Sequence, residues 1–76
     1  MEDKIERIIS EYERKISICD ELLRIDLVKK RVARRENDLE GVESFVKSIA
    51  IKNAQRQAYV QAIVDFDSLL DELLKK

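Results

Sequence analysis

The stretch Glu36-Asn37-Asp38-Leu39-Glu40-Gly41 divides the chain into two parts of similar length. The chain has one glycine and no proline, and this stretch is where its turn-forming residues gather. Asn37 followed by Glu40 has the spacing of a capping box, which would begin a second helix here. Alternatively, Gly41 ends the first helix and Ser44 caps the second. Both interpretations place the break within residues 37–43, and one continuous helix through Gly41 is the remaining alternative.

The composition on either side of this break predicts long helices. Charged residues make up 41% of the 76 residues and hydrophobic residues 45%, mostly types that favour helix. The net charge of −1 and the high aliphatic content do not fit a disordered chain. We therefore expect one all-α domain over residues 1–76. Its two helices, at about 3–36 and 42–74, should form an antiparallel hairpin.

A heptad seam runs along the first predicted helix, with apolar residues at alternating spacings of four and three. The seam residues are Ile5, Ile9, Tyr12, Ile16, Cys19 and Leu23. The next two seam positions are Asp26 and Lys30, so we expect the strict heptad to end after Leu23. Apolar residues then surround the helix over residues 22–28. Either the seam shifts, or more than one neighbour buries this stretch.

The second half carries a row of alanines at four-residue steps. The row consists of Ala50, Ala54, Ala58 and Ala62, with Val46 before it and Phe66 and Leu70 after it at the same spacing. A four-residue step keeps side chains on one narrow, slowly drifting line of a helix. Because an alanine side chain is a single methyl group, it keeps two helix backbones only slightly apart. The row therefore predicts the close approach of another helix.

A polar layer is predicted where the polar interruptions of the two helices fall at the same level. If the turn centres near residue 39, Asp26 lies opposite Lys52, with Asn53 and Arg56 within one turn. The second helix also lacks large apolar residues at this level. We expect Asp26 to bond with Arg56, Lys52 or Asn53. Such a layer selects register and partner number more than it adds stability.

The apolar surface is broader than one hairpin can bury. Residues off the main rows include Ile8, Ile18, Leu22, Ile25, Val32, Ile51 and Val64. A chain of this length usually needs disulfides, a metal or oligomerisation for extra burial. A lone Cys19 and the absence of histidine leave oligomerisation. We expect a homodimer in the form of an antiparallel four-helix bundle with two-fold symmetry.

No motif in the chain indicates catalysis. With no histidine and no glycine-rich loop, we expect neither catalytic residues nor a cofactor or metal site. The preferred interpretation is a non-catalytic protein–protein interaction module, a small adaptor, regulator or inhibitor that self-associates through its helices. The N-terminal residues lack a basic leader followed by an apolar stretch, and no apolar run reaches membrane length. We therefore expect a cytoplasmic protein that does not enter membranes.

The alternative is a small nucleic-acid-binding regulator that uses the basic segment 29–35. Five cations stand in seven residues, namely Lys29, Lys30, Arg31, Arg34 and Arg35. Such a cluster is able to contact phosphates. Against this, the chain is nearly neutral, with a pI of about 5.5, and no aromatic residue interrupts the cluster for base stacking. A solvated helix end, where cations suit the helix dipole, is the competing interpretation.

Overall fold

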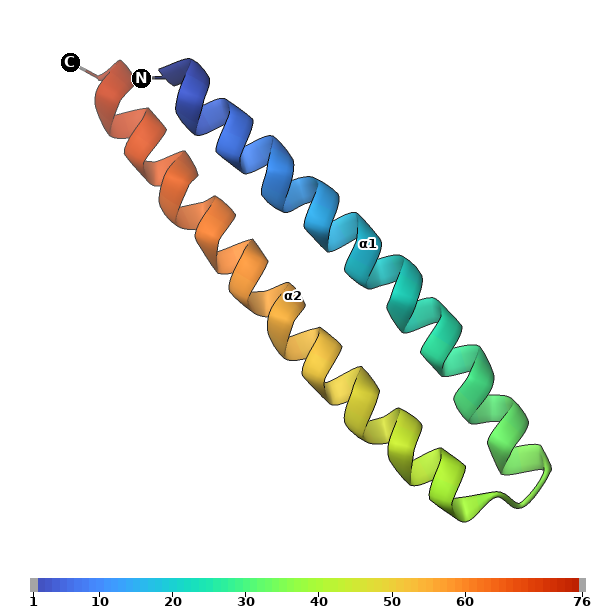
Figure 1. Cartoon of the computed structure of the whole chain (residues 1–76). Coiled ribbons are helices and arrows are strands. Elements are labelled where there is room, and N and C mark those ends of the chain that lie inside the picture. Colours follow the sequence, from blue (N-terminus) through green and yellow to red (C-terminus); the bar gives the residue numbers. More distant parts are fainter. Residues whose placement is uncertain (1, 76) are drawn as a thin grey trace.

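The computed structural model describes residues 2–75, which form a hairpin of two antiparallel helices (Figure 1). Helix α1 comprises Glu2–Arg35 and helix α2 comprises Leu39–Leu74. The described residues contain no strand. The Cα trace extends over 60 × 14 × 12 Å, and because residues 2–75 form only two helices, the hairpin is one helix thick in one direction. The expectation of two helices packed against each other is confirmed.

Local chemistry explains where α1 ends. Arg34 and Arg35 occupy its last turn, where cations suit the helix dipole. Asn37 then adopts a left-handed backbone conformation with φ of 57°. The N–H of Asp38 donates to the carbonyl of Ala33 at 2.9 Å, and the N–H of Asn37 donates to that of Arg34 at 3.2 Å. These two bonds form a Schellman motif, in which Asn37 takes the place usually held by glycine.

Asp38 begins α2. Its carboxylate accepts a hydrogen bond from the N–H of Gly41 at 3.0 Å, which satisfies one of the free donors of the first turn. Both capping expectations are therefore wrong, because Asn37 is not the N-cap and Gly41 lies inside α2, as does Ser44. The break comprises residues 36–38, so it is shorter than the predicted 37–43 and begins one residue earlier. One continuous helix does not form.

Replacing Asp38 by alanine is expected to lower the free energy of unfolding by about 1 kcal/mol, because the cap of α2 is lost. Urea denaturation measures this. Ser44→Ala, at an exposed position of α2, is the matched control and should change stability by less than about 0.5 kcal/mol. Equal losses in the two variants would show that the cap contributes nothing.

The contact between the helices consists of two continuous heptad seams. In α1 the most buried residues are Ile5, Cys19, Asp26 and Ala33, each 5–7% exposed. Asp26 and Ala33 follow Cys19 at steps of seven residues, and Lys30 between them is half-buried. The expectation that the heptad ends after Leu23 is therefore wrong, because the helix keeps its orientation and places polar residues in the seam.

The matching seam of α2 is half-buried throughout and also alternates between steps of four and three. It consists of Phe45, Ile49, Lys52, Arg56, Tyr59, Ile63, Phe66, Leu70 and Leu73. Since only one neighbouring helix covers it, none of these side chains is fully enclosed. The remaining apolar surface of both helices faces outward.

Candidate interaction surfaces

The polar residues of the two seams meet nearer the turn than the termini. The Lys52 ammonium and the Ser48 hydroxyl both donate to Oδ2 of Asp26, at 2.5 and 2.7 Å. Lys52 also donates to the Ser48 oxygen at 2.9 Å. The side chains of Asp26 and Lys52 are 10% and 23% exposed, so this pair is largely shielded from water. We call these three residues the polar triad.

The other two residues of the predicted layer, Arg56 and Asn53, do not bond to Asp26. Nε of Arg56 donates to Oδ1 of Asp20 at 2.7 Å, in a pair that is more exposed than the triad. Asn53 is exposed and makes no side-chain hydrogen bond within residues 2–75. Ser48 was not expected in the layer. Its position four residues before Lys52 is the signal that would have found it, because residues i and i+4 share a helix face.

The triad makes stability depend on acid pH. Hydrogen bonds from Lys52 and then Ser48 hold the pKa of Asp26 below its ordinary value of 3.8. A lowered carboxyl pKa contributes stability that is present above the unfolded-state pKa and is lost as pH falls through the folded-state pKa.

We therefore expect the stability difference between the unsubstituted chain and Asp26→Asn to be constant near neutral pH. It should shrink as the pH falls below 3.8, because protonated Asp26 then resembles the amide. Thermal unfolding of both chains at several pH values checks this. A difference that stays the same down to pH 2 would contradict it.

An aromatic cluster lies in the seam nearer the termini. The ring centroid of Tyr12 is 5.8 Å from that of Tyr59 and 6.2 Å from that of Phe66. Nζ of Lys15 lies 5.1 Å from the Tyr12 centroid and 5.8 Å from the Tyr59 centroid. These distances allow both aromatic pairing and a cation–π contact. The cluster joins α1 to α2 in the half of the hairpin that holds the termini, whereas Asp26 and Lys52 join the helices nearer the turn.

The alanine row does not face α1. Ala50, Ala54 and Ala58 are exposed and Ala62 is half-buried, whereas Phe66 belongs to the seam. At about 100° per residue, each four-residue step drifts by about 40° around the helix. The row therefore begins outside the seam and reaches it only at its end. Its role in self-association stays a prediction.

A second apolar row runs along the outside of α1. It consists of Ile18, Leu22, Ile25, Val28 and Val32, which we call the outer strip. These side chains are 42–54% exposed. At about 100° per residue they fall within an arc of about 120°. The hairpin itself leaves this strip without a covering helix.

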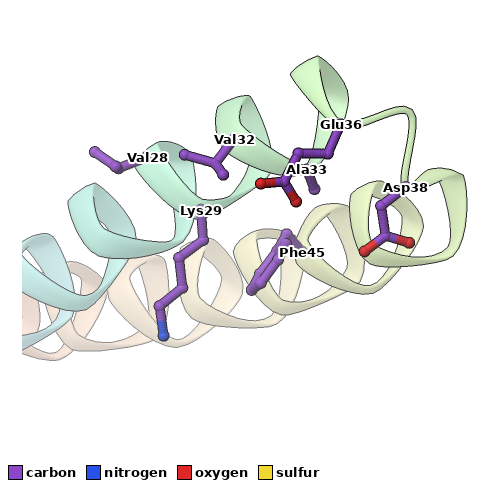
Figure 2. A pocket seen from close by; sticks show the side chains of 7 residues that line it. All are labelled: Val28, Lys29, Val32, Ala33, Glu36, Asp38 and Phe45. Atoms are coloured by element: carbon purple, nitrogen blue, oxygen red, sulfur yellow. The ribbon is translucent and has the colours of Figure 1, made fainter.

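The turn end of the outer strip opens into a shallow groove of about 280 Å³ (Figure 2). Val28, Val32 and Ala33 of α1 form its apolar side, and Phe45 of α2 lies opposite Ala33. Lys29 and Glu36 contribute opposite charges to its lining, and Asp38 lines the end beside the turn. The groove can thus accept an apolar side chain from a helix in which charged residues stand one turn before and after it.

The basic segment 29–35 lies at the end of α1 beside the turn. All of its cations are exposed except Lys30, which is half-buried in the seam. None of the five has a carboxylate within 4.0 Å among residues 2–75, where the four ion pairs involve other cations. Four acids follow the segment in sequence, namely Glu36, Asp38, Glu40 and Glu43. None of them forms an ion pair with it, and two bond elsewhere, since Asp38 caps α2 and Glu43 pairs with Lys47.

Comparison with protein-family models, with curated proteins and with solved structures gives no match. Within residues 2–75, neither helix has a stretch long and apolar enough to cross a bilayer. The same residues contain no group of three or more side chains placed to hold a metal ion.

Proposed function

We propose that the chain is a non-catalytic interaction module that binds other helices and associates with itself, as an antiparallel four-helix bundle dimer. The observation that carries the proposal is the outer strip, an ordered row of large apolar side chains outside the intramolecular seam. Monomeric proteins rarely leave such a row open to water. A second helical hairpin would cover it and supply the burial that a chain of this size lacks.

Sedimentation equilibrium over a wide concentration range, with helicity recorded on the same samples, tests the proposal. We expect a highly helical dimer at micromolar concentration. A chain that stays monomeric at every concentration would contradict self-association. In that case, the apolar surface would have to be covered by a different helical protein.

The basic segment favours a second candidate function, a nucleic-acid-binding regulator. Its support is the absence of carboxylate partners for the five cations within the described residues. Fluorescence anisotropy with a single-stranded RNA and a DNA duplex, each at several salt concentrations, tests it. Affinity that falls steeply with salt and weakens when Arg31, Arg34 and Arg35 are replaced by alanine would support this function. Salt-independent or absent binding would exclude it.

A further inference from the structure

The outer strip reads similarly in both directions about Ile25. Ile18 and Val32 lie seven residues on either side of Ile25, and Leu22 and Val28 lie three residues on either side. A two-fold axis through Ile25, perpendicular to α1, would therefore place apolar residues opposite apolar residues along the whole strip. Contacts in a two-fold dimer have this property, because the same patch is used on both subunits.

The charges beside the strip follow the same symmetry. Arg14 and Glu36 lie eleven residues on either side of Ile25, and Glu21 and Lys29 lie four residues on either side. All four are exposed. An antiparallel copy would bring Arg14 opposite Glu36 and Glu21 opposite Lys29, twice each per dimer. Glu21 already accepts from Arg24, and its carboxylate has further lone pairs for Lys29.

One symmetric pair has like charges, namely Lys15 and Arg35, ten residues on either side of Ile25. The Lys15 ammonium lies over the rings of Tyr12 and Tyr59, which belong to the seam. This contact directs the charge toward α2 and away from the centre of the strip. The arrangement therefore brings no pair of like charges face to face at the strip.

The groove shows how the contact would be filled. It is lined by Val32 between Lys29 and Glu36, three and four residues away. Ile18, which is 53% exposed, stands in the complementary arrangement between Arg14 and Glu21, four and three residues away. In the antiparallel arrangement, Ile18 of the second copy lies over the groove, with each of its charged neighbours opposite an opposite charge. The groove thus fits a second copy of this chain.

We propose that the dimer forms through the outer strip, with α1 antiparallel to α1 of the second copy and the two-fold axis at Ile25. This inference rests on the proposed self-association and specifies its surface and orientation. Electrostatic complementarity fixes the register of this contact, while the apolar side chains supply its burial.

Sedimentation equilibrium of Ile25→Glu tests the surface. Ile25 is 44% exposed in the hairpin, so the variant should keep its helicity. Two unpartnered carboxylates would be buried at the axis, and we expect the dimer dissociation constant to rise about 100-fold. Leu69→Glu is the matched control, since Leu69 is 43% exposed on α2 and should leave the constant unchanged.

A charge exchange tests the orientation. Glu21→Lys and Lys29→Glu each place like charges opposite each other and should weaken the dimer about fivefold, whereas the double variant should restore it. The same exchange at Glu43 and Lys47, an exposed pair on α2, is the control and should have no effect. Three results would each overturn the inference: a dimer that survives Ile25→Glu, a dimer that is disrupted by Leu69→Glu, or a double exchange that does not restore the dimer. A chain that never dimerises would overturn the proposed function itself.

Discussion

A hairpin with both Asp26→Leu and Lys52→Leu is expected to be at least as stable as the unsubstituted chain, whereas each single substitution lowers stability strongly. Either single change leaves a charged group in the seam without its partner, and the side chains of Asp26 and Lys52 are only 10% and 23% exposed. The double variant removes both charges and places leucine at two heptad positions. Thermal unfolding of the four chains as a double-mutant cycle measures the coupling between the two sites.

The pair Asp20 and Arg56 provides the matched control for this cycle. It also joins α1 to α2, but its side chains are 52% and 38% exposed. Solvent screens such pairs, so their coupling should be within about 1 kcal/mol. A coupling at Asp26 and Lys52 no larger than this would contradict the importance of burial in the triad.

The double leucine variant should also lose specificity. Polar residues in a heptad seam specify register and partner number, because a shifted register would bury them unpaired. We expect its sedimentation profile to show a mixture of oligomers. Arg56→Leu, which the sequence places in the same layer, should have a smaller effect because Arg56 bonds the exposed Asp20 instead.

The two helices and their level of pairing follow from the sequence by simple rules. Composition and the break near residue 38 indicate a hairpin, and pairing about a turn near residue 39 places Asp26 opposite Lys52 and Tyr12 opposite Phe66. The aromatic cluster was nevertheless missed, although the same pairing identifies it. Each aromatic residue taken alone fits an ordinary seam position, and only the pairing across the hairpin brings the rings together.

The continuation of the seam could not be recognised from apolar residues alone. Spacing determines which residues of a helix face a neighbour, so Asp26, Lys30 and Ala33 belong to the seam whatever their chemistry. The strictly alternating seam of α2 from Phe45 to Leu73 is the signal that supports this. Counting both helices together would have shown that neither seam is interrupted.

Which residues end α1 and cap α2 could not be predicted from the sequence, for a different reason. Asn37, Asp38 and Gly41 are each able to cap or terminate a helix, so residue type alone does not decide which of them does so. The structure places the left-handed conformation at Asn37, one of the few residue types besides glycine that tolerate it. With that position settled, Asp38 is the residue left to cap α2.

Replacing Tyr12 by alanine is expected to lower the free energy of unfolding by about 2–3 kcal/mol, because its ring contacts the rings of both Tyr59 and Phe66. The loss also removes the ring beneath the Lys15 ammonium. Urea denaturation at a fixed protein concentration measures the effect. In a hairpin only one helix thick, little other burial exists to compensate for it.

Tyr12→Phe separates the ring from the hydroxyl. No hydrogen bond of the Tyr12 hydroxyl occurs within the described residues, so this variant should change stability by less than about 0.5 kcal/mol. Tyr12→Leu keeps an apolar side chain but loses the aromatic pairing, and it should fall between the two. If alanine and phenylalanine proved equally stable, the aromatic cluster would not hold the helices together, and the polar triad and the aliphatic seam would have to do so alone.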